Sequence, residues 1–451
     1  MLSRTYSVRN ERRDHRWHVW RKGMQMTQRR TFLKQLGTVA GVSAFGSLLD
    51  VREAFAAQLP VSALDDTVSS SYALLKERYM LDPEITYFNH GSIGTIPRSV
   101  HEAHVGYLRV CESNPWLYMW GGEWEEPRER VREKAAAAFG CDPAEMCLTH
   151  NTTEGFSTVA NGMALGPGDE VVFSSLNHSG AGVCWSHNAP LKGFTVREFE
   201  FPVLDVPNMT VDDVLNLYDQ NISSRTRVLV LPHIDNVVGL VHPVREIAQL
   251  ARDKGVEIVA VDGAQSVGML ELDVSDLGVD LYCTSPHKWL QSPKGLGLMY
   301  MRRELQDNVH PMWVTWGQAR WRDSIRQFED YGTRNLPELI TLGDAIDFQL
   351  SLGAKAKVER YRHLWEVFRS AALESDHVIW RSPDTWPLSA SLYAVEVRDK
   401  VSTEVSESMY QDHGFVFRPF RTQNLNTLRI SPNVYNTEEE IARFFELIAK
   451  L

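Results

Sequence analysis

The sequence has little cysteine and no long apolar run, and it lacks an excess of positive charge. Its 451 residues include 5 cysteines and carry a formal net charge of −11 at pH 7. No two cysteines form a C-x-x-C pair, so neither a metal site nor a disulfide framework is expected. The acidic balance argues against nucleic acid as a partner. The 43% apolar and 23% charged fractions are ordinary for a globular protein, and no internal repeat is visible.

The first 56 residues differ in charge from the rest. They hold 11 Lys and Arg against 4 Asp and Glu, a balance of +7 that leaves −18 for residues 57–451. Paired arginines at 29–30 precede a mild apolar run at 36–49, and Ala-Phe-Ala ending at Ala56 matches a small-residue cleavage pattern. The apolar run is too short and too rich in Gly and Ser to span a bilayer, so no stable membrane anchor is expected.

This head resembles a bacterial twin-arginine signal. It therefore predicts export to the periplasm by the twin-arginine translocation machinery, with cleavage near Ala56. Because that route carries proteins that are already folded, it favours a protein that receives a cofactor before export.

Short β-branched runs alternate with helical stretches from about residue 145. Continuously apolar strands between helices predict an α/β protein with a mainly parallel central sheet covered on both faces. The strands are expected at 170–173, 227–231, 256–261, 280–283 and 296–301, with a helix over 243–254.

The pattern changes after about residue 330 and predicts a smaller α+β domain. Its expected elements are a helical region over 337–373, strands near 392–397 and 428–431, and a closing helix over 437–451 that starts with a cap and an acidic first turn. The expected organisation is a signal and leader over 1–56, an N-terminal segment over 57–85, a large domain over 86–330 and a small C-terminal domain over 331–451.

Polar residues follow two neighbouring strands of the predicted sheet. Asp262 ends one strand, with Gln265 one turn further on, and Ser285, His287 and Lys288 follow the next strand. In parallel sheets the ligand site lies at the carboxyl ends of the strands. A lysine amine can form a Schiff base with an aldehyde cofactor, and pyridoxal phosphate also needs an acid opposite its ring nitrogen.

The combination of Asp262-x-x-Gln265 with Ser285-x-His287-Lys288 resembles the lysine region of the class V aminotransferases. This is the branch of pyridoxal-phosphate fold type I that contains cysteine desulfurases and isopenicillin N epimerase, and the resemblance covers roughly residues 80–450. It implies a three-layer fold with a mainly parallel sheet, pyridoxal 5′-phosphate as the cofactor, and a homodimer with each site at the subunit interface.

The resemblance implies a role for each matching residue. Lys288 would bind the cofactor and then move a proton at the substrate α-carbon. Asp262 would stabilise the pyridinium, Gln265 would hydrogen-bond the ring oxygen and His178 would stack on the ring. The other cofactor contacts are expected from Thr152, Thr153, Ser285 and His287 at the phosphate, Asn236 near the ring oxygen, and Thr333 at the phosphate of the neighbouring subunit.

Substrate contacts are expected from the loop 87–94, through Asn89 and His90, and from Arg429, whose planar fork suits a carboxylate. Structural alternatives stay open at this point. They are a surface role for His178, an N-cap for Thr152, turn roles for Asn236, Asn89 and His90, and an ion pair for Arg429.

The sequence departs from the cysteine desulfurases, which carry a nucleophilic cysteine shortly before the carboxylate-binding arginine. The corresponding stretch, 413–428, has no cysteine, so persulfide-forming chemistry is not expected. The signal, the Asn-His-Gly-Ser loop and the missing cysteine resemble periplasmic members of the branch that tailor the glutamate side arm of the peptide siderophore pyoverdine.

That second resemblance implies transamination or oxidative decarboxylation of a glutamyl group. Epimerisation, C–S lysis and a non-catalytic pyridoxal-phosphate-binding protein remain as alternatives. The expected substrate is an amino acid or another small-molecule or peptidic amine. Arg418, Arg421 and Arg334 are candidates for a second carboxylate contact.

Overall fold

The computed structural model describes residues 72, 74–422 and 424–451. The paired arginines and the cleavage pattern lie outside these residues, so the signal and the export that it implies stay predictions. Among the helices of the described ranges, none has the length and apolar character needed to cross a membrane.

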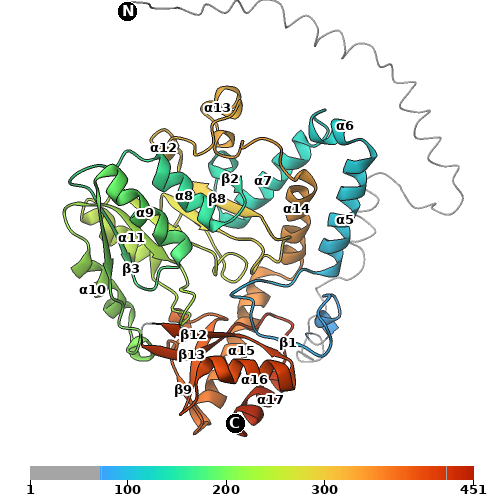
Figure 1. The fold of residues 1–451 in the computed structure, drawn as a ribbon, viewed down its shortest axis with the longest axis vertical. Helices are drawn as coiled ribbons and strands as arrows, with labels where there is room; N and C mark the ends of the chain where they lie inside the picture. The colour runs from blue at the N-terminus through green and yellow to red at the C-terminus, as the bar shows by residue number, and fades with distance from the viewer. Residues whose placement is uncertain (1–71, 73, 423) are drawn as a thin grey trace, which may run out of the picture. The chain divides into compact units, whose positions relative to one another are not determined.

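A seven-stranded sheet with the order β2-β8-β7-β6-β5-β3-β4 forms the centre of the larger part (Figure 1). The strands are β2 Met146–Thr149, β3 Glu170–Ser174, β4 Thr195–Phe199, β5 Thr226–Pro232, β6 Ile258–Asp262, β7 Leu281–Thr284 and β8 Gly297–Met301. Neighbours from β7 to β4 pair in parallel, whereas β8 is antiparallel to both β7 and β2. The expected mainly parallel sheet is confirmed.

The sheet is the middle of three layers, because alternate side chains of its strands enter two separate cores. Leu229 and Val259 pack with one set of helices, whereas Val228, Ala260 and Cys283 pack with the other. The first set is α7 Glu125–Phe139, α10 Val211–Asn221, α11 Val244–Asp253 and α14 Leu336–Ser351, and the second is α8 Thr152–Gly162 and α9 Ser179–Lys192. Burial on both faces explains the continuously apolar strands.

The C-terminal part is built on a four-stranded antiparallel sheet with the order β12-β13-β10-β9. Its elements gather at one end of the molecule in Figure 1. They are α15 Ala354–Glu374, β9 Val378–Trp380, β10 Tyr393–Val397, α16 Ser402–His413, β11 Phe415–Val416, β12 Arg418–Thr422, β13 Leu425–Ile430 and α17 Glu438–Ile448. Thr437 and Glu440 form a capping box at the start of α17, as its sequence predicts.

Two details differ from the sequence pattern. The region 337–373, which was expected to be helical, forms two helices, α14 and α15. They are separated at Gly353, a residue with φ of +75°. The first strand, β1 Thr86–Tyr87, pairs in parallel with β11 of the C-terminal part. The remaining labelled helices are α5 Arg98–Ser113, α6 Pro115–Met119, α12 Arg303–Gln306 and α13 Gly317–Arg320.

Candidate active site

The predicted acid and lysine lie at the same edge of the sheet. Asp262, the last residue of β6, lies beside Cys283 of β7 in the strand register. Its buried carboxylate accepts a hydrogen bond of 2.9 Å from the backbone N–H of Ala264. Lys288 follows β7 in a turn in which its backbone N–H donates to the carbonyl of Ser285 at 3.1 Å. The carboxylate and the amine therefore come from adjacent parallel strands.

The amine of Lys288 is half-buried and has no hydrogen bond or ion pair to any described residue. Burial lowers its pKa to about 8, and although Asp262 opposes this shift, the positive charges of Arg429 and Arg418 add to it. Near that pH a large fraction of the amine is neutral, and a neutral amine is the nucleophilic form.

The N-terminus of α8 lies against the residues that precede the lysine. The backbone N–H and the hydroxyl of Thr152 both contact the hydroxyl of Ser285, at 3.0 and 2.8 Å. Asn151 caps the helix by accepting from the N–H of Glu154 at 2.9 Å. The neighbouring N–H of Thr153 has no acceptor among the described residues. Two hydroxyls and an open helix N-terminus form a site suited to an anion.

His287 adds an imidazole beside this site. Its Nδ1 is buried without a hydrogen-bond partner in the described part of the chain. Burial, together with the positive charges of Lys288 and Lys294, lowers the pKa of His287 to about 4. The ring is therefore neutral at physiological pH and can donate one hydrogen bond.

His178 is the N-cap residue of α9, where its Nδ1 accepts from the backbone N–H of Gly180 at 3.0 Å. Burial lowers the pKa of this imidazole. The charges of Asp262, Lys288, Arg418 and Arg429 also act on it. His178 therefore lies near the residues that the sequence assigns to the same site, and its ring is held by the cap.

Gln265 is buried, and both ends of its amide are used. Its nitrogen donates to the carbonyl of Gly91 at 2.8 Å, and its oxygen accepts from the indole N–H of Trp289 at 2.8 Å. One amide hydrogen is left for the expected ring oxygen. The side chain therefore also joins the N-terminal loop to the residue after Lys288.

The loop 89–94 is fixed between the C-terminal strands and the lysine turn. Asn89 bridges to Ser431, and the N–H of Gly94 donates to the carbonyl of His287 at 2.8 Å. A Cβ on Gly94 would lie 2.0 Å from the carbonyl oxygen of Lys288, so only glycine permits this approach. The loop is positioned by the same turn that carries the lysine.

His90 is enclosed by aromatic side chains. Its side chain has no exposed surface, its Nε2 lies 3.1 Å from the Thr95 hydroxyl, and its ring packs near those of Tyr87, Trp289 and Tyr435. Its Nδ1 has no hydrogen-bond partner among the described residues. Burial lowers its pKa to about 3, so the ring is neutral. In this enclosure His90 supports the loop, and its expected substrate contact stays a prediction.

Arg429 lies on β13 with 1% of its surface exposed. Its guanidinium group donates hydrogen bonds to the carbonyl of Asn236 at 3.0 Å, to Oδ1 of Asn89 at 3.2 Å and to the hydroxyl of Ser92 at 2.5 Å. All three acceptors are neutral, and its Nε has no partner in the described residues. A substrate carboxylate would therefore replace Asn89 and Ser92. Asn236 contributes its backbone carbonyl here, and its side chain has no hydrogen bond to the described residues.

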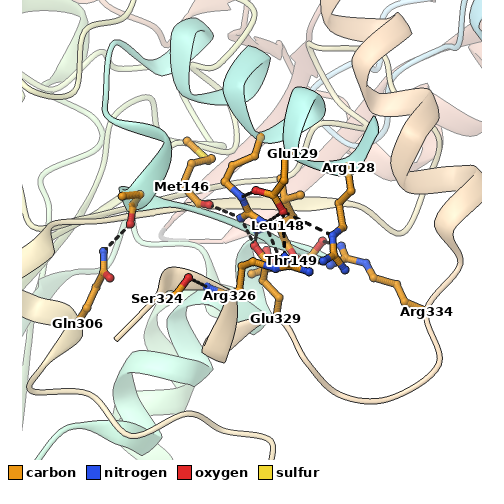
Figure 2. A network of polar contacts seen from close by, with 12 residues as sticks. Arg128, Glu129, Met146, Leu148, Thr149, Gln306, Ser324, Arg326, Glu329 and Arg334 are labelled. Carbon is orange, nitrogen blue, oxygen red and sulfur yellow. Dashed lines mark hydrogen bonds and ion pairs between the residues drawn. The ribbon is translucent and has the colours of Figure 1, made fainter. Parts of the chain in front are cut away.

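The turn 332–334 is attached to the end of β2 (Figure 2). The Arg334 guanidinium donates to the carbonyls of Leu148 and Thr149 at 2.6 and 3.1 Å, just before the cap of α8. Arg334 is thus occupied and is not a carboxylate contact. Thr333 is exposed and makes no hydrogen bond to a described residue, so its expected contact with a neighbouring subunit stays a prediction.

Sequence reasoning missed Ser92 and Trp289. Ser92 lies in the quoted loop, but only the fold brings its hydroxyl to Arg429. Trp289 follows the lysine directly, and a buried indole requires an acceptor, which Gln265 supplies. Adjacency to the lysine was the available signal for Trp289, and membership of the Asn-His-Gly-Ser loop was the one for Ser92.

A family model described as aminotransferase class-V matches residues 86–444. Isopenicillin N epimerase of Streptomyces clavuligerus is 29% identical over 391 residues, which is 83% of this chain and 96% of the relative. A probable cysteine desulfurase of Halobacterium salinarum is 28% identical over 400 residues, 83% of this chain and 94% of the relative.

Solved structures share the fold. A mutant of C-DES with glycine covalently linked to its pyridoxal-phosphate cofactor has a TM-score of 0.76 at 23% identity, and the match covers 83% of this chain and 99% of that one. The apo cysteine desulfurase of Thermococcus onnurineus has a TM-score of 0.72 at 24% identity, covering 83% and 98%. These matches establish the three-layer fold with its C-terminal antiparallel sheet.

The residues fit pyridoxal phosphate. Within the described part of the chain, Lys288 offers an amine without a partner, and Asp262 a carboxylate with one open oxygen. In the same residues, the start of α8 leaves one N–H without an acceptor, and the buried Nδ1 of His287 has no partner. The fold, the matched model and these groups agree. The chain is a member of the class V aminotransferases, an enzyme family whose cofactor is pyridoxal phosphate.

Proposed function

We propose that the protein is an exported enzyme that acts at the amine-bearing carbon of an amino acid or of a peptide-linked amino group. The observation that carries this proposal is the amine of Lys288, which has no partner, has a pKa lowered to about 8 and lies beside Asp262. A buried amine with a lowered pKa at the carboxyl edge of a parallel sheet is equipped for covalent and proton-transfer chemistry.

The cofactor, when bound, supplies an electron sink for the pair left behind at the substrate carbon. Thr152, Ser285 and His287 hold its phosphate, with the N–H of Thr153. Asp262 holds the proton on its ring nitrogen. His178, fixed by its cap on α9, covers one ring face.

Lys288 and Arg429 act on the substrate. The amine of Lys288 takes a proton from the α-carbon and can return it. The Arg429 fork orients the carboxylate once Asn89 and Ser92 have been displaced. Epimerisation would require that a proton return to the opposite face of the α-carbon, whereas transamination would require that Lys288 carry the proton away from that carbon.

Transamination of a glutamyl group, as in siderophore tailoring in the periplasm, is our leading assignment. The paired arginines at 29–30, the cleavage pattern at 54–56 and the loop 89–92 support it. Epimerisation is the second candidate, since a relative that matches 83% of the chain carries that name.

A persulfide mechanism is not proposed, because no cysteine is placed for it. The hairpin that precedes Arg429 has none, and all five lie at position 283 or earlier. Cys283 is buried against α8, where burial raises the pKa of its thiol.

Homodimerisation is part of the proposal, with Thr333 reaching the phosphate of a neighbouring copy. It is supported by the exposure of Thr333 on a turn that is firmly attached to β2.

The test is the visible absorption spectrum of the protein after loading with pyridoxal phosphate. The wild type is expected to show the band of lysine-bound cofactor, and Lys288→Ala to lose it. Lys355→Ala, a change of an exposed lysine at the start of α15, is the matched control and should keep the band. A wild type without a band, or a Lys288→Ala variant that keeps it, would contradict the proposal. Candidate amines that change the band identify the substrate class.

A further inference from the structure

Two arginines lie opposite each other at the mouth of this site. Arg418 of β12 is the register partner of Arg429 of β13, which places their Cβ atoms about 5 Å apart on the same face of the sheet. Their guanidinium carbons lie 4.9 and 5.2 Å from the centre of the Phe420 ring. Like charges directly opposite in a sheet are destabilising, so this pair needs a compensating reason.

No acidic group of the described protein neutralises the pair. The segment 418–430 has three arginines and no Asp or Glu, in a chain with 58 acidic residues. Arg418 makes no ion pair or hydrogen bond to a described residue, and the fork of Arg429 contacts only neutral oxygens. The negative charge of Asp235 acts on Arg429 and opposes the lowering of its pKa. The Asp235 carboxylate, however, accepts hydrogen bonds from the backbone N–H groups of Val237, Val238 and Leu240.

The charge of Arg418 is felt inside the site. It contributes to the lowered pKa values of Lys288, Arg429 and His178. Arg421 does not act on these groups, and because side chains alternate along a strand it lies on the opposite face of β12. Of the three arginines that the sequence offered, Arg334 is occupied at β2 and only Arg418 faces the site.

The two arginines also differ in access. Arg418 is exposed, whereas Arg429 is buried beneath Asn89 and Ser92. A ligand that arrives from solvent therefore meets the Arg418 fork without displacing any protein group. Arg429 lies deeper and contacts the same aromatic ring.

We propose that Arg418 binds a second acidic group of the substrate, so that the site takes an amino acid or a peptide-linked amine that carries two acidic groups. One carboxylate occupies Arg429 and the other Arg418, and together they neutralise a pair that the protein leaves unneutralised. This proposal rests on the proposed function, because it assumes that the substrate enters the site of Lys288.

The test is calorimetric binding of two five-carbon acids to the cofactor-loaded protein. Glutarate has two carboxylates, pentanoate has one, and neither has an amine, so the readout is affinity and not turnover. The wild type should bind glutarate about tenfold or more tightly than pentanoate, as expected for one added charge-assisted fork. Arg418→Gln should lose that preference, Arg418→Lys should keep part of it, and the matched control Arg421→Gln should keep all of it.

Equal affinities in the wild type would overturn the proposal. So would an Arg418→Gln variant that keeps the preference or loses affinity for both acids equally. A melting curve of each variant without ligand separates loss of binding from loss of folding, and Arg418→Lys repeats the test if Arg418→Gln does not fold. The two proposals fail separately. If the protein shows the Lys288-dependent absorption band but binds both acids equally, only this inference is contradicted. If it prefers glutarate but shows no such band, the proposed function is contradicted.

Discussion

Two arginine clusters of this protein differ in how their charge is neutralised. Near β2, Arg132 pairs with Glu329 and Glu129, and Arg326 pairs with Glu125. Glu129, Glu329 and Arg326 of this cluster are labelled in Figure 2. On β12 and β13, Arg418 and Arg429 have no carboxylate partner in the described chain. Buried charges are normally paired, so the first cluster is complete by itself, whereas the buried Arg429 of the second lacks a carboxylate and fits our proposal of an anionic ligand. The contrast separates an arginine that holds the fold from one that binds a ligand.

Glu329→Gln should have the largest effect on stability. It removes the buried carboxylate from the Arg132 guanidinium, which keeps only the half-exposed Glu129, and it weakens the acceptor of the Leu148 N–H, at a cost of about 3–5 kcal/mol in the free energy of unfolding. Denaturant unfolding measures it, and a loss below about 1 kcal/mol would contradict it. Burial alone would raise the pKa of Glu329, but Arg132 holds it below the ordinary 4.5. The stabilisation is therefore full above that pH and is lost as the pH falls further.

Arg429→Gln should have the opposite profile. It removes a fork that has no acid partner, so the free energy of unfolding should change by less than about 2 kcal/mol. Substrate affinity should fall by about 10- to 100-fold, the value of a charge-assisted pair. Affinity titration and unfolding of the same preparation measure both. A variant that unfolds readily but binds normally would place Arg429 with the structural cluster.

The unpaired cluster should also shift the pH at which the lysine reacts. With the pKa of Lys288 lowered from 10.5 to about 8 by burial, Arg429 and Arg418, the rate at which the apoprotein takes up pyridoxal phosphate should rise with pH to a half-maximum near 8. Replacing Arg418 with Gln removes a repelling charge, so the midpoint should move upward. An absorbance time course at each pH follows the uptake, and a midpoint that stays near 10.5 would argue against the desolvated amine.

The smallest effect is expected at an exposed pair. Glu126 and Arg130 are four residues apart on α7, and both are largely solvent-exposed. Glu126→Gln should change the free energy of unfolding by only about 0.3–0.5 kcal/mol, less at high salt. If Glu126→Gln lowered the free energy of unfolding as much as Glu329→Gln, burial would not explain why one ion pair stabilises the protein more than the other.

Local patterns predicted five of the seven strands of the central sheet and missed β2 and β4. Periodicity placed β3, β5 and β8, and the segment 262–288 placed the acid and the lysine at one edge, because parallel strands end on the same side. The capping box of α17 could also be predicted from the sequence, because Thr437 and Glu440 are three residues apart. Each of these features depends on neighbours in the sequence.

The parts that the sequence did not reveal depend on distant partners. Gln265 meets Trp289 and Gly91 only in the folded chain, and Ser92 meets Arg429 across 337 residues. The sequence likewise does not distinguish Arg334 from Arg418. The Arg334 guanidinium donates to two backbone carbonyls, whereas that of Arg418 has no hydrogen bond to a described residue. The enclosure of His90 by aromatic rings from three segments is likewise visible only in the folded chain.

The pairing of β1 with β11, and of the Gly91 N–H with the Ser431 hydroxyl 340 residues later, sets the order in which the protein can be completed. The loop that contacts the lysine turn gains its partners on β11 and at Ser431 only after the last strands have left the ribosome. Such contacts carry a large loop-closure entropy and form late in folding. The anion-binding edge is thus the last part to become ordered, so a synthesis stopped short of residue 431 should yield a sheet without a working site.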